Sequence, residues 1–119
     1  MTPGRLDMEI PRNGSDARLL KLYTRDEDGA EAPCDLTGCT VSAVARDIFG
    51  GDEIATAAVN IDTPAEGLVS IEWRGSQFDG FGNLFATASA AWDLKVVDPD
   101  GLPTVPVRGI LYISPEATA

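Results

Sequence analysis

Residues 39–46 read Cys39-Thr-Val-Ser-Ala-Val-Ala-Arg46, and their apolar side chains fall on alternate positions. An extended chain would place Cys39, Val41, Ala43 and Ala45 on one face and Thr40, Ser42 and Arg46 on the other. This period of two predicts a half-buried β-strand. The same period returns in Trp92-Asp-Leu-Lys-Val96, within the run 85–97, where Trp92, Leu94 and Val96 share a face. No stretch of about twelve residues has apolar residues at a spacing of three and four between a good cap and a terminal glycine, so the chain is expected to be all-β.

Five further runs of β-forming residues are separated by turn residues. They are residues 6–10, 17–24, 54–61, 68–73 and 105–113. The runs 54–61 and 68–73 are predicted to be antiparallel neighbours joined by a short loop. Pro106 cannot donate a hydrogen bond to a sheet, so the run 105–113 is expected at an edge or at the start of a strand.

About seven strands at this spacing predict an immunoglobulin-like antiparallel β-sandwich. A chain of 119 residues fits one domain. We expect residues 1–119 to form that domain, with 1–16 as an extended N-terminal arm and 114–119 as a short C-terminal tail.

The composition restricts the classes of partner. The chain has 19 acidic and 9 basic residues and a formal net charge of −10. Such a surface repels phosphates, so nucleic acid is not an expected partner. A membrane is not expected either, because anionic headgroups attract basic segments and no apolar run is long enough to span a bilayer. The first residues show no secretory signal pattern.

No catalytic, cofactor-binding or metal-binding residues are predicted. The chain has no histidine to activate a serine or cysteine nucleophile, and it lacks the phosphate-cradling and dinucleotide motifs. An enzyme is therefore the weakest hypothesis. Asp26-Glu-Asp-Gly29 and Asp98-Pro-Asp-Gly101 resemble the opening of a calcium loop without its remaining ligands, so both are expected to be tight turns. Cys34 and Cys39 are compatible with a short-loop disulfide or with two buried thiols.

The aromatic residues offer the candidates for binding. Trp73 and Trp92 lie on strand-like runs and are predicted to be core, although an aromatic face is also what a sugar stacks on. Phe78 and Phe81 lie in Gly75-Ser-Gln-Phe-Asp-Gly-Phe-Gly-Asn83, whose glycines offer little to bury them. They are expected either to form a contact surface or to tuck back onto the end of the domain.

Four stretches together resemble the immunoglobulin-like domain of tailed-bacteriophage virion proteins, the type at the N-terminus of the baseplate upper protein. They are residues 19–29, 35–47, 64–71 and 92–101, and include Asp35-Leu-Thr-Gly38 before an alternating strand and Trp92-Asp-Leu94 before a turn. The 75–83 loop departs from that pattern, because it is longer and more aromatic.

The resemblance implies a non-enzymatic structural protein of a phage or phage-like particle, made in the host cytoplasm and located in the virion. Its expected partners are capsid, tail or baseplate proteins and further copies of itself. Contact would be made by interfacial burial and by pairing of an exposed strand edge, either 105–113 or 1–11. The candidate interface residues are Phe78, Phe81, Val105, Val107 and Ile110. A carbohydrate- or cell-surface-binding sandwich and an acidic mimic of nucleic acid remain as alternatives.

Overall fold

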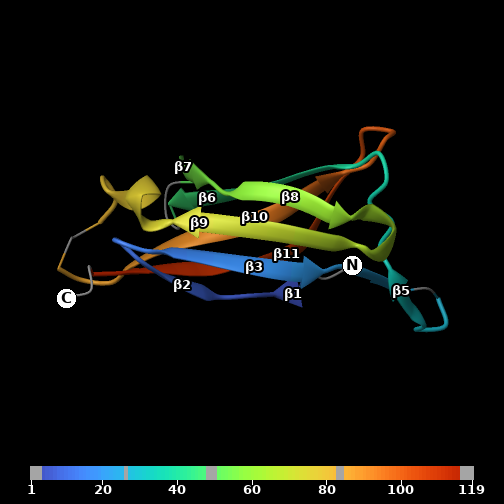
Figure 1. The fold of residues 1–119 in the computed structure, drawn as a ribbon, viewed down its shortest axis with the longest axis horizontal. Helices are drawn as coiled ribbons and strands as arrows, with labels where there is room; N and C mark the ends of the chain where they lie inside the picture. The colour runs from blue at the N-terminus through green and yellow to red at the C-terminus, as the bar shows by residue number, and fades with distance from the viewer. Residues whose placement is uncertain (1–3, 26, 48–50, 83–84, 116–119) are drawn as a thin grey trace.

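The computed structural model describes residues 4–25, 27–47, 51–82 and 85–115, and these form an all-β sandwich (Figure 1). The strands are β1 Gly4–Arg5, β2 Met8–Pro11, β3 Ser15–Lys21, β4 Tyr23–Arg25, β5 Glu31–Pro33, β6 Thr40–Asp47, β7 Glu53–Thr56, β8 Ala58–Thr63, β9 Leu68–Arg74, β10 Ala88–Val97 and β11 Pro103–Ser114. Two short 3₁₀ helices, η1 Pro64–Glu66 and η2 Gly75–Phe78, precede and follow β9.

The strands form two packed sheets and a separate ribbon. One sheet is six-stranded, in the order β1-β11-β10-β6-β7 with β2 also paired to β11, and the other is three-stranded, in the order β3-β9-β8. In Figure 1 the three-stranded sheet lies in front of β6, β10 and β11. Strands β4 and β5 pair only with each other among the described residues, and their ribbon projects from one end of the sandwich. We call that end the distal end.

The alternation in the sequence places the core correctly. Trp92, Leu94 and Val96 of β10 are buried, as are Ala43 and Ala45 of the neighbouring β6. Across the sandwich, β9 contributes Val69, Ile71 and Trp73 to the same core. Burial of alternate side chains from two facing sheets is what stabilises a sandwich. The core predictions for Trp73 and Trp92 are therefore confirmed.

The run 54–61 is not one strand, as was predicted, but two. It breaks at Ala57, where the chain leaves β7 of the six-stranded sheet and enters β8 of the three-stranded sheet. The Ala57 N–H donates to the Ala43 carbonyl, so the crossing residue is still tied to β6. The expected antiparallel pair with the run 68–73 is confirmed for β8 and β9.

The run 105–113 is not an edge strand, so the first of the two places expected from Pro106 is wrong. Pro106 does lie near the start of its strand, since β11 begins at Pro103, and this agrees with the second. Strand β11 lies inside the six-stranded sheet, with β10 antiparallel on one side and β1 and β2 parallel on the other. Pro106 falls near a shift in the register between β10 and β11, a place that tolerates a missing donor. Residues 4–11 are sheet strands rather than a free arm. Within the described residues, β1 and β2 form an edge of the six-stranded sheet, so of the two segments that were predicted to pair with a neighbour, the N-terminal one lies at an edge.

Gly109 explains how the N-terminal segment packs closely against β11 between β1 and β2. A Cβ on Gly109 would lie 1.9 Å from the Leu6 carbonyl oxygen, so only glycine lets the two backbones come this close. The same carbonyl accepts a hydrogen bond from the Trp92 indole Nε1 at 2.8 Å. Beside it, Asp7 interrupts the ladder between β1 and β2, and its Oδ1 accepts the Ile110 N–H at 2.9 Å. The break between β1 and β2 is thus held against β11 by one core aromatic and one carboxylate.

Candidate functional site

A groove of about 470 Å³ opens at the distal end, between the β4–β5 ribbon and the turn that joins β10 to β11. We call it the distal groove. It is lined mainly by apolar groups, which come from Leu22, Tyr23, Cys34, Cys39, Val96, Leu102, Val105 and Pro106. The carboxylates of Asp35 and Asp98 also line it. The distal groove is therefore an apolar hollow with an acidic margin.

Three large apolar side chains around the distal groove are exposed to solvent. Tyr23 is 49% exposed, Leu102 is 64% exposed and Val105 is 36% exposed. Together we call them the distal patch. Single exposed apolar residues are ordinary, but a cluster around one hollow is typical of a surface that another molecule covers.

Hydrogen bonds hold Leu102 in its exposed place. The Asp98 Oδ1 accepts the N–H groups of Asp100 and Leu102, each at 2.9 Å. Gly101 closes the turn at a φ of 88°, where a side chain would be strained. The predicted tight turn at residues 98–101 is confirmed, and it presents Leu102 from a rigid support. At the other predicted turn, Gly29 has the positive φ expected of it, while residue 26 lies outside the described residues.

Cys34 and Cys39 are free thiols that line the distal groove. Of the two alternatives for this pair, the thiol form is the one present, but both side chains are half-buried rather than buried. Burial raises the pKa of the Cys34 thiol, and the nearby Cys39 and Asp35 raise that pKa further. A raised pKa keeps the thiol protonated at neutral pH, and a protonated thiol is a poor nucleophile and a poor metal ligand. Cys34 therefore contributes apolar surface to the groove.

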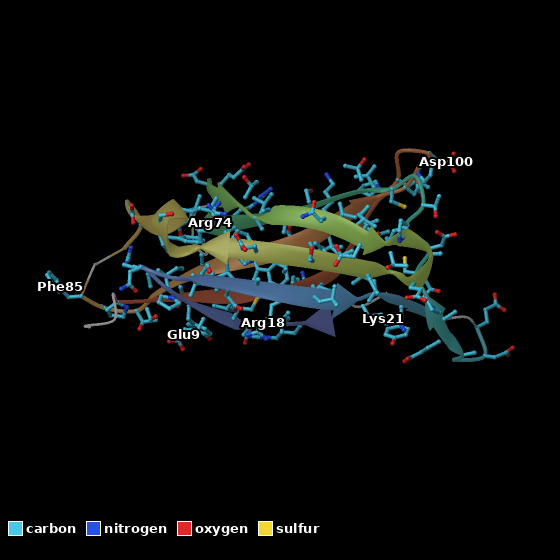
Figure 2. All side chains as sticks on the ribbon, viewed as in Figure 1. Glu9, Arg18, Lys21, Arg74, Phe85 and Asp100 are labelled. Carbon is cyan, nitrogen blue, oxygen red and sulfur yellow. The ribbon has the colours of Figure 1, made fainter. Side chains whose placement is uncertain are left out.

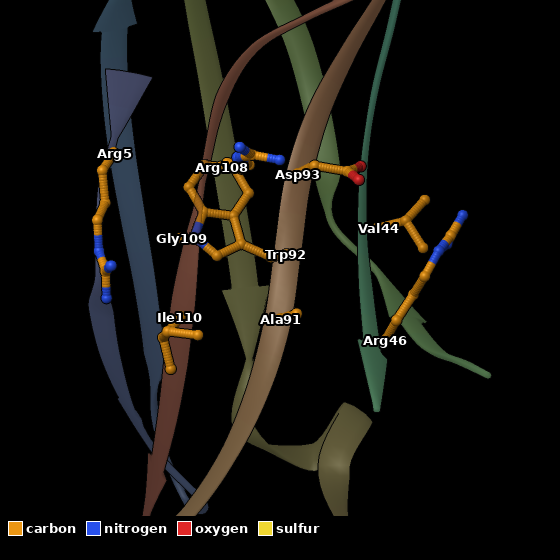
Figure 3. A pocket seen from close by; sticks show the side chains of 9 residues that line it. All are labelled: Arg5, Val44, Arg46, Ala91, Trp92, Asp93, Arg108, Gly109 and Ile110. Carbon is orange, nitrogen blue, oxygen red and sulfur yellow. The ribbon is translucent and has the colours of Figure 1, made fainter. Parts of the chain in front are cut away.

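A second hollow, of about 530 Å³, lies on the outer face of the six-stranded sheet (Figure 3). We call it the arginine hollow. Ala91 of β10 pairs with Arg46 of β6 on one side and with Ile110 of β11 on the other, so its small side chain leaves room between two larger ones. Arg108 extends from β11 towards Asp93 on β10, and Arg5 and Arg46 lie on either side (Figure 3).

The arginine hollow concentrates positive charge on an acidic protein. It is lined by three of the nine basic residues of the chain, against one carboxylate, that of Asp93. The Arg5 guanidinium forms an ion pair with Asp7 at 3.1 Å, and its hydrogen bond is the main reason why the pKa of Asp7 is lowered. Within the described part of the chain, Arg46 and Arg108 have no carboxylate within ion-pair distance. These two guanidinium groups are thus available to a carboxylate from outside.

The structure divides the predicted interface residues between different places. Val105 belongs to the distal patch and Ile110 lines the arginine hollow. Val107 is partly buried against the core, as is Phe81. The five residues therefore do not form one surface, because β11 passes through the sheet with alternate side chains on opposite faces.

Phe78 is fully buried, so the alternative that it tucks back onto the domain is confirmed and the prediction that it is an exposed contact residue is wrong. Its relative exposure is 0%, and its ring centroid lies 6.2 Å from that of Trp73. Gly75 lets the loop turn inwards, since a Cβ there would lie 2.1 Å from the Pro11 carbonyl oxygen. The glycines of this loop thus allow burial of the phenylalanine instead of preventing it.

Arg12 fastens this loop, a role that the sequence analysis missed. Its side chain is buried, and its guanidinium donates to the Phe78 carbonyl at 2.7 Å and to the Phe81 carbonyl. Burying an arginine is costly unless its donors are satisfied, and the carbonyls of an irregular loop accept from both Nη atoms of this one. No local sequence pattern marks such a contact, because its partners lie 66 and 69 residues away.

The tryptophans do not form a sugar-stacking platform. Both are buried, and their rings meet edge to face with centroids 6.3 Å apart. A ring with both faces in the core cannot stack on a ligand. The Trp73 indole Nε1 has no hydrogen-bond partner among the described residues.

No family model matches the chain, and no curated protein matches it.

Within residues 4–25, 27–47, 51–82 and 85–115, no three His, Cys, Asp or Glu side chains gather where they could hold a metal ion. None of the helices in that part of the chain is long and apolar enough to cross a membrane.

Proposed function

We propose that this protein is a non-enzymatic structural component of a bacteriophage or phage-like particle, and that it acts by docking its distal patch onto a neighbouring protein of that particle. The single observation that carries the proposal is the gathering of Tyr23, Leu102 and Val105 around one apolar groove. The four stretches that resemble phage virion domains supply the class of particle.

The chemistry of the distal end indicates what kind of surface would fit. Leu102 and Val105 would lose water-exposed apolar area on docking, at roughly 25 cal/mol for each Å². Asp35, Asp98 and the exposed Asp100 surround that area with negative charge. A matching partner surface therefore has an apolar centre and a basic margin, because unpaired charges at a buried contact are unfavourable.

We further propose that the sandwich is of the immunoglobulin-like kind. Support comes from the pairing of a large sheet with a small one, from the passage of the chain between them at Ala57, and from the buried Trp92 at the centre of the core. In this proposal the sandwich is a rigid support, and the contacts are made by its end and by its outer faces.

The test measures incorporation into particles. Density-purified particles from the source would be analysed by mass spectrometry, with peptide counts scaled to the major capsid protein, for the wild type and for the double variant Leu102→Ser/Val105→Ser. We expect the wild type in the particle fraction and the double variant depleted by at least tenfold, with unchanged thermal stability of the isolated protein.

Leu19→Ser is the matched control. Leu19 is 61% exposed on the three-stranded sheet, close to the 64% of Leu102, but it lies outside the distal groove. This variant should remain in the particle fraction. Absence of the wild-type chain from particles would overturn the proposal, and so would equal incorporation of Leu19→Ser and the double variant.

A further inference from the structure

We infer that the neighbour contacted by the distal patch is a second copy of this chain, and that the 98–102 turn of one copy docks into the arginine hollow of the next. The inference rests on the proposed function in one respect, since it takes the distal end to be a contact surface. It adds the identity of the partner and the site on it.

The arginine hollow has the shape and the groups to receive this turn. Val44 and Ile110 supply apolar walls beside the small Ala91, and the guanidinium groups of Arg46 and Arg108 lie at the margin. A planar guanidinium offers several N–H donors in a fixed fork that matches a carboxylate. An apolar side chain next to a carboxylate is therefore the chemistry that this hollow fits.

The 98–102 turn presents that combination. Leu102 is the most exposed residue of the distal patch, and Asp100, two positions before it, is exposed as well. Figure 2 shows Asp100 at the extreme of the β10–β11 turn. The turn is held by the Asp98 carboxylate, which accepts two backbone N–H groups, so docking would cost little conformational entropy. Leu102 would enter the hollow while the Asp100 carboxylate approaches Arg46 and Arg108.

Charge complementarity is the reason to choose a second copy of the chain. The net charge is −10, yet the arginine hollow carries three arginines and one aspartate. The distal end has the opposite character, because its acidic residues outnumber its basic ones. The acidic residues are Glu27, Asp28 and Glu31 of the β4–β5 ribbon and Asp35, Asp98 and Asp100 around the groove, against Lys21 and Arg25. One chain thus bears two complementary surfaces.

The two surfaces cannot meet within one molecule. Asp93 of the hollow and Asp98 of the turn are five residues apart, roughly 17 Å along a strand that rises about 3.3 Å per residue. The hollow faces outwards from the sheet, whereas the turn extends along the strand direction. Contact between different patches on successive copies is heterologous, so it repeats from copy to copy and forms a ring or a filament.

The experiment uses charge reversal on each surface separately. One variant is Arg46→Glu/Arg108→Glu and the other is Asp100→Lys, and each is studied alone and in an equimolar mixture by sedimentation velocity over a range of concentrations. The wild type should self-associate as concentration rises. Each variant alone should associate at least tenfold more weakly, because its hollow and its turn then carry the same sign of charge.

The mixture gives the decisive reading. The unchanged turn of the first variant fits the unchanged hollow of the second, and the lysine of the second faces the glutamates of the first. Association should therefore return to at least the wild-type level. A mixture that associates no better than its components would overturn the inference, as would a wild type that stays monomeric up to millimolar concentration.

Matched controls separate this contact from a general effect of charge. Arg18→Glu/Arg74→Glu changes the net charge equally but lies on the three-stranded sheet, and Asp79→Lys lies at the opposite end from Asp100. Both controls should associate like the wild type, and weakening by either to the level of the test variants would contradict the inference. Particle incorporation that depends on Leu102, with no self-association, would leave the proposed function standing and the inference refuted. Self-association of a chain that is absent from particles would refute the proposed function and leave the inference standing.

Discussion

Replacing Phe78 by alanine tests whether the 75–83 loop is part of the core. The ring is 0% exposed and packs against Trp73. A buried aromatic ring removes roughly 150–250 Å² from water, worth about 4–6 kcal/mol at ~25 cal/mol per Å². Measured losses for such replacements are about 3–5 kcal/mol, because neighbouring groups partly fill the cavity. We expect Phe78→Ala to lower the free energy of unfolding by about 3–5 kcal/mol.

The assay is urea unfolding at equilibrium, followed by the fluorescence of the tryptophans. Phe85→Ala is the matched control, since Phe85 is 91% exposed and follows Phe78 by only seven residues. Substitutions at exposed positions usually change stability by less than about 0.5 kcal/mol. A loss below about 1 kcal/mol for Phe78→Ala, equal to that of Phe85→Ala, would refute the burial of this loop.

Three further changes test the contacts that fix the N-terminal segment and the loop. Arg12→Leu leaves the Phe78 and Phe81 carbonyls without their donor, so the free energy of unfolding measured in urea should fall by about 2–4 kcal/mol. A fall of less than about 0.5 kcal/mol would contradict the role given to Arg12. Gly109→Ala forces a Cβ against the Leu6 carbonyl, so it should lower the free energy of unfolding by about 1–3 kcal/mol and shift the NMR signal of the Trp92 indole N–H. Gly80→Ala is the control, because a Cβ there would have open space, and it should have neither effect. The pKa of Asp7 is lowered by Arg5 and by the Ile110 N–H, so its contribution to stability is present above the unfolded-state pKa of about 3.9 and is lost as pH falls through the lower, folded-state pKa. The melting temperatures of wild type and Asp7→Asn should therefore differ at pH 7 and converge near pH 2, and a constant difference would show that the carboxylate charge is not involved.

Alternation along the chain predicts which side chains are buried, but it does not predict which strands are neighbours. Residues 39–46 and 92–96 were assigned to the correct faces, because a period of two is a local property. The crossing at Ala57 was missed, since an alternating run looks the same whether or not it changes sheets. The central place of β11 was missed because proline has no N–H to donate and is therefore expected at an edge. The register shift beside Pro106 removes the need for that donor.

The binding surfaces were harder to predict than the core. Val105 and Ile110 were both chosen as members of the run 105–113. They lie at the distal groove and at the arginine hollow, and their part in an interface stays a prediction. Arg46 and Arg108 lie on the outward faces that alternation implies. They line the same hollow only because their strands, β6 and β11, both pair with β10. Phe78 was misplaced for a related reason, since its burial depends on Arg12, 66 residues away, and on the close approach of Gly75 to the Pro11 carbonyl.

The strand edges along one side of the sandwich are poorly suited to pairing with a strand of another molecule. This favours contacts that are made by side chains at the end and on the outer face. Along one side, the edge formed by β1 and β2 is interrupted at Leu6 and Asp7. The neighbouring edge strand β3 places Arg18 opposite the buried Ile71, on the core-facing side, where it pairs with Asp16. Interrupted edges and inward-facing charges are features that prevent edge-to-edge pairing. A head-to-tail contact between the 98–102 turn and the arginine hollow uses neither of these edges, so copies could assemble while the sheets stay protected against uncontrolled aggregation.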